Sequence, residues 1–562
     1  MEQTENDVAA EICEDSLSGA SRSIGTQESV RLRSDDSVPP FGPFSALYRR
    51  IGAMGFALVA FVAIGSLLLP KGPDQAMWTW VGNVILDHGV PYRDAWDIKG
   101  PLTEYINALI DAVFGDDEWG LRVADLLAVA GSAWILRRLV LLLNSQHRFG
   151  ANCAIFLFCL MYYAGGYANT AQAEGWGGML ILWSVALLVS FRSRPTLVMA
   201  WSGVLVALAT LIKPTFGIYI VLPLVHPARS TSPDGSRVLG RLASLASFSL
   251  VVGCGTLFLF VSGALHDYID ILRYIYTTYE PLGHPPLSQV LLGLPMSLAE
   301  NGLLIPYLIA ALGLWRLHLN ASTDAARLLA VWLGLATLTV VIQRRYWQDH
   351  WLPASLAIAT LLGVAISYIT DWLLRANVGK RRKQAALLLV TVISLTPCMA
   401  RSLWSNYTWP LYVLSLQTRE DYITAATKPF DEIPERFNYL TLQRVASYVR
   451  AHSRPEDKLG IWGWDVSIFI MSHRASATRF GVYQGLDDEV GPLRAYYRQI
   501  FLQELESKLP RLFIVDTQGA YFLPKGTGET LLNDFPELHQ FIQRRYRKIA
   551  TLDVYQIWEL VD

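Results

Sequence analysis

The sequence KGPDQAMWTWVGNVILDHGVPYRDAWDIKGPLTEYINALIDAVFGDDEWG occupies residues 71–120 and separates the first two long apolar segments of the chain. A loop between two membrane-spanning segments lies at a membrane face. This loop is rich in Trp, Tyr, Asp and Lys, and it contains two amphipathic segments, around 76–88 and 103–114. We interpret the loop as the active site of a membrane enzyme, with the two amphipathic segments as helices in the interface.

The rest of the composition supports a membrane protein. The chain has 562 residues, of which 52% are hydrophobic, and the apolar residues form runs of about the twenty residues that a bilayer requires. The predicted fold class is a polytopic α-helical membrane protein with about eleven transmembrane helices. The approximate spans are 51–70, 119–141, 151–168, 174–191, 196–212, 214–227, 242–262, 301–317, 327–342, 351–374 and 385–401.

Two further regions flank the predicted membrane domain at 46–401. Residues 1–45 are rich in Ser, Asp and Glu with few aromatics, which predicts a disordered segment. Residues 402–562 alternate helical and strand-like patterns, such as FNYLTLQRVASYVRAH at 437–452 followed by KLGIWGW at 458–464. This alternation predicts a small external α/β domain.

The basic residues predict the orientation. If the N-terminus is cytoplasmic, every inner connection is basic, as the positive-inside rule requires. The N-terminus is therefore expected in the cytoplasm, and an odd number of spans then places the C-terminal region outside. The inner basic residues are Arg137, Arg138, Arg148, Arg192, Arg194, Arg229, Arg237, Arg241, Arg316, Arg327, Arg375, Lys380, Arg381, Arg382 and Lys383.

Cations on the outer face are the exceptions to this pattern. They can bind a lipid phosphate, Arg through two nitrogens and Lys as a point charge. Snorkelling towards headgroups is the alternative, and we prefer it for Lys71 and Arg93. We predict phosphate binding by Lys99, Arg344 and Arg345, because each stands among aromatic residues in a short loop.

Among the outer acids, Asp74 follows directly on the first apolar segment. A carboxylate there can accept a proton from a hydroxyl at the membrane surface. It can also serve as the N-cap of the next helix. Glu174 begins a later apolar segment, where a cap and a site carboxylate are equally open. His350 can bind phosphate or sugar beside Arg345 and Tyr346, although a lone interfacial His is more often structural.

Several other functions lack support. The sequence has no P-loop, no GxGxxG between a strand and a helix, no HExxH and no GxSxG. The net charge of −1 gives no indication of a nucleic-acid partner, and none is expected. Nucleotide-driven transport and zinc or serine hydrolysis are therefore unsupported.

Four phrases resemble the bacterial membrane glycosyltransferases of the C-type superfamily. This superfamily includes protein O-mannosyltransferases, the lipid A aminoarabinose transferase and lipopolysaccharide-core galacturonosyltransferases. The phrases are PDQAMWTWVGNVILDHGVPYRDAWDIKGPL (73–102), NTAQAEGWGGMLILW (169–183), ALATLIKPTFGIYIVLPL (207–224) and RRYWQDHWLPASLAIA (344–359). The later stretch VASYVRAHSRPEDKLGIWGW is similar to the periplasmic domain of these proteins.

The resemblance implies a function at the bacterial inner membrane. A polyprenyl-phosphate sugar would be the donor, a lipid, glycan or protein hydroxyl the acceptor, and transfer would take place on the periplasmic face. Asp74 would be the catalytic base and Glu174 a second site acid, with Lys99 as a phosphate ligand. Membrane lipids surround the protein. The predicted substrate-binding residues are Tyr92, Asp97, Lys213, Tyr346 and His350.

One residue departs from the superfamily pattern. Gln75 stands where an acid usually follows the Asp, which weakens a metal-binding role for that pair but not the base role of Asp74. The sequence identifies no cofactor with certainty, and a divalent metal is left open. The alternatives to a glycosyltransferase are a transporter or flippase of lipid-linked sugar and a non-catalytic envelope sensor or scaffold.

Overall fold

A computed structural model describes residues 45–144, 148–190, 195–226, 234–279, 285–319, 323–427, 438–487, 492–518 and 527–561. The predicted disordered segment lies outside these residues except for its last position. The chain divides into a unit Met1–Leu47 and a unit Tyr48–Asp562. The site and all the packing described below belong to the second unit.

Eight helices in the described residues are long and apolar enough to cross a membrane. A bent pair, with 102° between its two helices, adds a ninth if it counts as one span. The predicted fold class, a polytopic helical membrane protein, is confirmed. The eight are α2 (Ser45–Ser66), α5 (Glu118–Leu143), α8 (Ala173–Ser190), α9 (Pro195–Ile212), α11 (Asp234–Val261), α15 (Thr323–Gln343), α16 (Leu352–Arg375) and α17 (Lys380–Asn406), and the pair is α13 (Leu287–Glu300) with α14 (Leu304–Leu319).

The predicted count of eleven spans is therefore higher than the structure supports by helix length. The remaining two predicted segments are shorter apolar helices, α6 (Arg148–Tyr163) and the stretch Pro214–Val225. The 16 residues of α6 extend about 24 Å at 1.5 Å per residue, whereas the apolar core of a bilayer is about 30 Å thick. An apolar run in a sequence does not reveal where the helix inside it stops.

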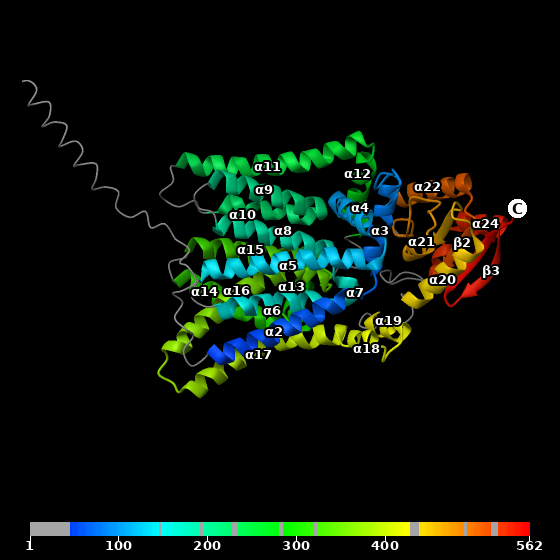
Figure 1. Ribbon diagram of the computed structural model, residues 1–562. Coiled ribbons are helices and arrows are strands. Elements are labelled where there is room, and N and C mark those ends of the chain that lie inside the picture. Colours follow the sequence, from blue (N-terminus) through cyan, green and yellow to red (C-terminus); the bar gives the residue numbers. More distant parts are fainter. Residues whose placement is uncertain are drawn as a thin grey trace, which may run out of the picture. The chain divides into compact units, whose positions relative to one another are not determined.

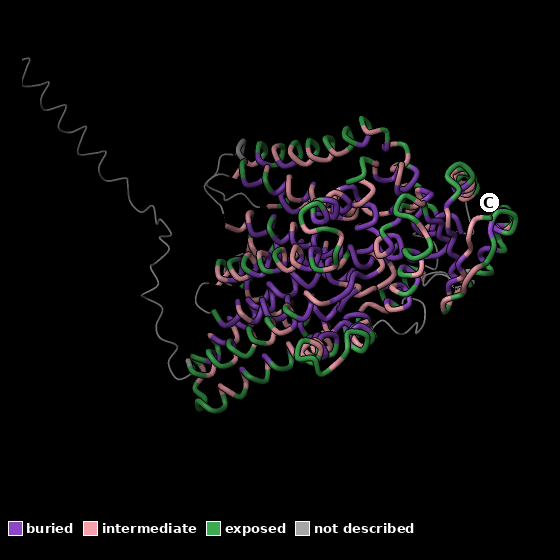
Figure 2. The backbone as a smooth tube through the Cα atoms, turned by 45° about the vertical axis from the view of Figure 1, so that its right-hand side comes forward, coloured by how far each residue is buried: buried purple, intermediate pink, exposed green. Residues whose placement is uncertain are grey.

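The centre of the bundle is made by α6 and α16. Every residue of α6 from Phe149 to Tyr163 is buried except Asn152, and most of α16 is buried too. The two helices approach closely where small residues face each other. A Cβ on Gly150 would lie 2.2 Å from the Gly363 carbonyl oxygen, so no side chain fits there. Exposed positions follow the outer helices (Figure 2), and on α11 they include Leu250, Phe260 and Val261.

The loop at 71–120 forms two helices, α3 (Pro73–Leu86) and α4 (Pro101–Phe114), close to the predicted positions. They pack against each other near the end of the bundle that adjoins the strands (Figure 1). In α3, all residues from Gln75 to Gly82 are buried. The Trp80 ring stacks on Phe469 of the C-terminal region at 5.9 Å between centroids. The segment 75–82 of α3 is thus covered by protein, unlike a helix that lies with one face in lipid.

The C-terminal region contains a four-stranded sheet in the order β1-β2-β4-β3. The β1 and β2 strands are parallel and every residue in them is buried, whereas β4 is antiparallel to β2 and β3. The predicted helix–strand alternation is present, but β3 was not predicted. The elements are α20 (Tyr439–His452), β1 (Leu459–Trp462), α21 (Ser467–Ser472), α22 (Pro492–Lys508), β2 (Leu512–Asp516), α23 (Gly528–Asn533), α24 (Pro536–Arg545), β3 (Tyr546–Leu552) and β4 (Tyr555–Leu560). The domain boundaries at 45/46 and 401/402 stay predictions.

Short helices complete the end of the bundle that carries the site. They follow the long helices directly or precede them, so polar residues at helix ends come together there. They are α7 (Gly166–Asn169), η2 (Pro214–Ile220), α12 (Leu265–Tyr274), η3 (Ile275–Tyr279), η4 (Asp349–Trp351), α18 (Trp409–Val413) and α19 (Arg419–Thr427). The short helix α10 (Val221–Val225) continues from η2 away from this end (Figure 1).

Candidate active site

A pocket of about 510 Å³ lies where the loop at 71–120 meets the ends of several long helices. Its walls come from α3, from the starts of α8, η2 and η4, from α12 and η3, and from α19 and α20. Charged residues are concentrated in it, although most of its neighbours are apolar helices. The acidic and basic lining residues are Asp74, Asp97, Lys99, Glu174, Lys213, Arg345, Asp349, His350 and Arg401.

Asp74 is the second residue of α3 and lines the pocket. The alternative role as N-cap is filled by other residues: Gly72 is the N-cap, and its amide donates a hydrogen bond of 2.7 Å to Gln75 Oε1. The Asp74 carboxylate is therefore not used in capping. Its side chain is 39% exposed, and Oδ2 lies 3.7 Å from Lys99 Nζ. A carboxylate in the first helical turn is also favoured by the helix dipole.

Gln75 has a structural explanation. Besides accepting from Gly72, its Oε1 accepts from the Arg122 guanidinium at 3.0 Å, while its amide nitrogen donates to the carbonyl oxygens of Tyr167 and Thr170. An amide can donate and accept at once, which a carboxylate cannot do. Gln75 thus joins α3 to α5 and to the residues before α8, and it does not line the pocket.

Glu174 stands in the first turn of α8 and is almost completely buried. Its Oε1 contacts Lys213 Nζ, which also donates to Gln343 Oε1 at 2.5 Å. Lys99 Nζ lies 3.8 Å from the same Glu174 oxygen. The array therefore runs from Gln343 through Lys213, Glu174 and Lys99 to Asp74, with ammonium and carboxylate groups in alternation.

The backbone brings the two lysines together. Gly100 N donates to Ile212 O at 3.0 Å, and Thr103 Oγ1 donates to the same carbonyl at 3.0 Å. A Cβ on Gly100 would lie 2.2 Å from the Leu211 carbonyl oxygen, so only glycine permits this approach. Lys99 is consequently held beside Lys213, although the two are far apart in the sequence.

Three further contacts orient Lys99. The Tyr92 hydroxyl donates to its carbonyl oxygen at 2.9 Å, Asp97 Oδ2 accepts from its amide at 3.2 Å, and its ammonium lies 5.5 Å from the Trp78 ring centroid. Burial disfavours the charge on Lys99, but the carboxylates of Glu174 and Asp74 outweigh burial and raise its pKa. Lys99 is therefore a permanent cation in the site.

The pKa of Asp74 is raised above its ordinary value. Withdrawal from bulk water is the main cause, the Glu174 and Asp97 carboxylates add to the rise, and Lys99 opposes it. A carboxylate with a raised pKa is a stronger base than an exposed one.

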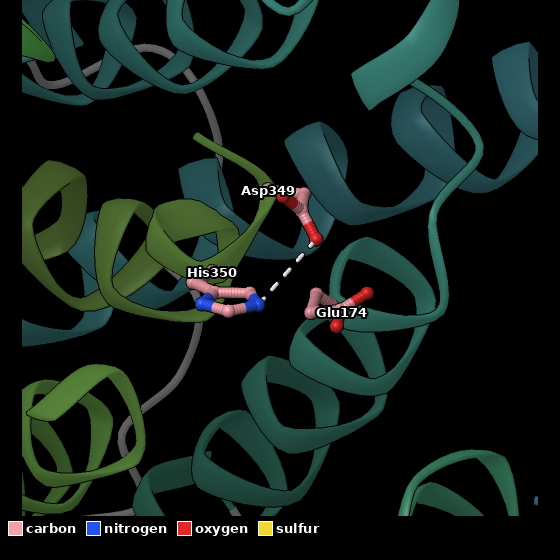
Figure 3. A group of neighbouring side chains, drawn as sticks. All are labelled: Glu174, Asp349 and His350. Carbon is pink, nitrogen blue, oxygen red and sulfur yellow. Dashed lines mark ion pairs between the residues drawn. The ribbon is translucent and has the colours of Figure 1, made fainter. Parts of the chain in front are cut away.

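Glu174, Asp349 and His350 form a group that could hold a metal ion (Figure 3). One ligand atom from each lies within 4.8 Å of the others, and His350 Nε2 is 3.9 Å from Asp349 Oδ2. An imidazole with two carboxylates is a donor set that suits zinc. Lys213 already contacts Oε1 of Glu174, which leaves Oε2, a buried oxygen without a hydrogen-bond partner in the described residues. The residues thus fit a divalent ion through that oxygen, and such an ion would supply further positive charge to the pocket.

Arg345 lies over the rings of Tyr279 and Trp347, at 4.2 and 5.1 Å from the centroids, and donates to the Tyr279 carbonyl at 2.8 Å. Arg401 donates to Gln348 Oε1 at 3.1 Å. Both guanidinium groups line the pocket apart from the lysine–carboxylate array, so the pocket holds cations from four different segments with Lys99 and Lys213.

Seven of the ten predicted site residues line this pocket. These are Asp74, Asp97, Lys99, Glu174, Lys213, Arg345 and His350. The other three do not. Tyr92 is buried and supports the backbone of Lys99, the Tyr346 hydroxyl donates to Val290 O, and Arg344 is absent from the lining.

The lining also holds residues that were not predicted as site residues, and these include Gln343, Asp349, Arg401 and Trp78. Asp349 and Gln343 stand in or next to the phrase QRRYWQDHWLP, from which Arg344, Arg345, Tyr346 and His350 were chosen. An acid adjacent to a chosen histidine was the available signal for Asp349. Arg401 follows an apolar run without any motif, and we find no sequence signal for it.

Residues 98–252 match the family described as dolichyl-phosphate-mannose-protein mannosyltransferase. The structure is similar to that of ArnT from Cupriavidus metallidurans bound to undecaprenyl phosphate, with a TM-score of 0.56 and 14% identity over 92% of this chain and 98% of that one. The fold is ArnT-like. It is also similar, with a TM-score of 0.48 and 12% identity, to the Archaeoglobus fulgidus oligosaccharyltransferase, over 83% of this chain and 70% of that one. No curated protein sequence matches the chain significantly.

These similarities can be compared with the resemblance that the sequence predicted. The resemblance to C-type glycosyltransferases, which use a sugar on a lipid phosphate, is confirmed by the family match over less than half of the chain. At this identity the structural likeness establishes the fold alone.

Proposed function

We propose that this protein is a glycosyltransferase that moves a sugar from a polyprenyl-phosphate donor to an acceptor hydroxyl. The observation that carries the proposal is the lysine–carboxylate array of Asp74, Lys99, Glu174 and Lys213 in a pocket at the ends of the membrane helices. The family match over residues 98–252 supports the donor class, as does the undecaprenyl phosphate bound to the structurally similar ArnT.

Asp74 acts as the base in this proposal. It removes the proton of the acceptor hydroxyl, whose oxygen attacks the anomeric carbon while the bond to the phosphate oxygen breaks, so the anomeric configuration inverts. A polyprenyl phosphate leaves as an anion and needs no proton. A single base is therefore sufficient, in contrast to the two carboxyl groups of a glycosidase.

The cations of the pocket stabilise the departing phosphate. Lys99 is next to the base, and Arg345 and Arg401 supply further positive charge on the lining. Arg344 has no part in the proposal because it does not line the pocket. Glu174 contacts both lysines, so we assign it the task of holding Lys99 and Lys213 in place and not that of a second base.

We also propose a location and orientation. The basic connections of the sequence argue for a cytoplasmic N-terminus in a bacterial inner membrane, with the pocket and the C-terminal sheet on the periplasmic face. Polyprenyl-linked sugars and acceptors would meet there.

Asp74→Asn tests the base assignment in purified protein reconstituted into lipid vesicles. We expect transfer from a lipid-phosphate sugar to fall by about 10²- to 10⁴-fold, the usual contribution of a general base, while donor affinity is retained. Asp87→Asn is the matched control, because Asp87 is an exposed acid just after α3. Near wild-type transfer by Asp74→Asn would refute the base role. Release of free sugar at the expense of transfer in the wild type would instead identify a hydrolase.

A further inference from the structure

Among the side chains that the C-terminal region contributes to the pocket, Trp464 and Gln484 are two that the proposed chemistry does not use. Trp464 follows β1, and Gln484 lies in the segment between α21 and α22. The pocket wall that they form belongs to the sheet-bearing part of the chain, whereas the charged array comes from the loop at 71–120 and the membrane helices. No motif in the sequence marked either residue.

The backbone holds these two residues next to each other. Tyr483 N donates to Gly463 O at 3.0 Å, so the segments that carry Gln484 and Trp464 are joined one residue before each of them. The chain then turns at Gly485, whose φ of +80° favours glycine. A Cβ on Gly485 would also lie 3.1 Å from Trp96. The positions of both residues are thus determined by local backbone geometry.

The same segment is docked on the loop that carries Lys99. Trp96 N donates to Arg479 O at 2.7 Å, and the Trp96 ring packs against Phe480 at 6.3 Å between centroids. Arg479 in turn forms ion pairs with Asp267 of α12 and Glu504 of α22, at 3.1 and 2.9 Å. The wall formed by Trp464 and Gln484 is therefore tied to the loop that bears the catalytic groups.

Gln484 lines the pocket with a side-chain amide that protein does not fully enclose. It is 8% exposed, and its side chain makes no hydrogen bond to any residue that the structure describes. Buried amide groups almost always have partners, because an unsatisfied one loses its hydration without compensation. An amide that lines a pocket without a protein partner is therefore available to a ligand.

We propose that Trp464 and Gln484 form a saccharide subsite, an inference that rests on the proposed glycosyl transfer. A sugar ring offers an apolar face of C–H groups, which packs on an indole, and an edge of hydroxyl groups, which exchange hydrogen bonds with an amide. A phosphate would instead require the cations found elsewhere in the pocket. A polyprenyl chain would leave the amide unsatisfied.

The sugar held here is that of the donor or that of a glycan acceptor, and the test separates the two. The experiment uses full-length protein in lipid vesicles with undecaprenyl phosphate carrying mannose, galacturonic acid or 4-aminoarabinose, and with bare undecaprenyl phosphate as the sugar-free probe. Trp464→Ala and Gln484→Leu are compared with Trp464→Phe, which keeps an aromatic plane, and with Trp404→Ala, which removes a 66% exposed tryptophan of α17.

If the subsite holds the donor sugar, Trp464→Ala and Gln484→Leu weaken binding of the best sugar-bearing donor by roughly 3- to 10-fold each, and binding of bare undecaprenyl phosphate does not change. If it holds the acceptor sugar, donor binding and slow donor hydrolysis are unchanged, while KM for the envelope glycan acceptor rises by a similar factor. Trp464→Phe recovers most of the loss in either case. A merely structural role would weaken the binding of bare undecaprenyl phosphate as well.

An active wild type whose donor and acceptor constants are the same in all variants would overturn the subsite and leave the proposed function intact. Equal losses for the sugar-bearing and sugar-free lipids would overturn it as well, because the defect would then not concern the sugar. A folded wild type that turns over none of the three donors would refute the proposed function, and the subsite with it.

Discussion

Two lysines of the loop at 71–120 have similar surroundings, but their pKa values are shifted in opposite directions. Lys71 and Lys99 are both largely buried and both lie near carboxyl groups. Lys71 donates to the Asp116 carbonyl at 2.7 Å and stands 3.9 Å from Asp111, and burial lowers its pKa. The carboxylates around Lys99 raise its pKa instead.

The difference teaches how to distinguish a structural cation from a functional one. Lys71 uses its ammonium in a short hydrogen bond inside the loop that bears it. Lys99 has only longer contacts, 3.7 Å to Asp74 and 3.8 Å to Glu174, and its partners come from two different helices around a pocket. Its remaining N–H groups can turn to a substrate phosphate, so we expect the two lysines to respond differently to the same substitution.

In the comparison of the two lysines, the largest effect is expected for donor binding by Lys99→Met. Hydrogen bonds to charged groups contribute about 2 kcal/mol, which corresponds to a roughly 30-fold weaker affinity for the lipid-phosphate donor. Lys71→Met should leave this affinity within about twofold of the wild type. Titration of undecaprenyl phosphate into both purified variants measures the difference, and equal affinities would remove the functional distinction between the lysines.

Stability should show the reverse order. Lys71→Met deprives Asp111 and the Asp116 carbonyl of their partner, and we expect the free energy of unfolding to fall by about 1–2 kcal/mol. Lys99→Met should cost less, since Glu174 keeps its contact with Lys213. Thermal melting of both variants in the same detergent is the measurement. A larger loss for Lys99→Met would mean that Lys99 is the structural residue.

The carboxyl group of Asp111, which lies next to Lys71, makes stability depend on pH. Burial raises its pKa to about 7, although Lys71 opposes the rise. Because the folded state binds this proton more tightly than the unfolded state, the contribution of Asp111 is fully present below about pH 4 and is lost as the pH rises to about 7. The melting temperature of the wild type should therefore decline over this pH range, and Asp111→Asn should remove the part of the decline that Asp111 causes. Parallel pH curves for variant and wild type would contradict the raised pKa.

The smallest effect concerns the acid limb of transfer activity. Asp74 must be ionised to act as a base, and its pKa is raised, so activity should fall at a higher pH than an ordinary aspartate would cause. The Glu174 carboxylate contributes to the rise. The acid limb of the pH–rate profile, measured on the residual activity of Glu174→Gln, should therefore move to lower pH. A shift to higher pH would contradict this electrostatic account.

Much of the site could be inferred from the sequence because charge is rare in an apolar chain. Asp74 and Glu174 stand next to the ends of apolar segments, and Lys99 stands in the charged loop between two of them. All three reach the pocket. The strand at 459–462 was also recognisable from the strand-like stretch KLGIWGW.

Other parts of the site depended on backbone conformations that the sequence does not reveal. Arg344 and Tyr346 both have φ of +52°, a region that residues other than glycine rarely adopt. Arg345 between them lines the pocket, and its two neighbours do not. A run of Arg-Arg-Tyr alone cannot tell which of the three side chains faces the site.

The sequence by itself determined that this is a polytopic helical membrane protein with a charged first loop and a C-terminal helix–strand region, because apolar runs and residue periodicity report on local burial. Only the tertiary structure decided that Lys99 meets Lys213, through the contact of Gly100 with Ile212, and that Trp464 and Gln484 share the pocket with Asp74. These are contacts between residues more than a hundred positions apart, and they arise from close packing of whole elements, which a linear pattern does not record.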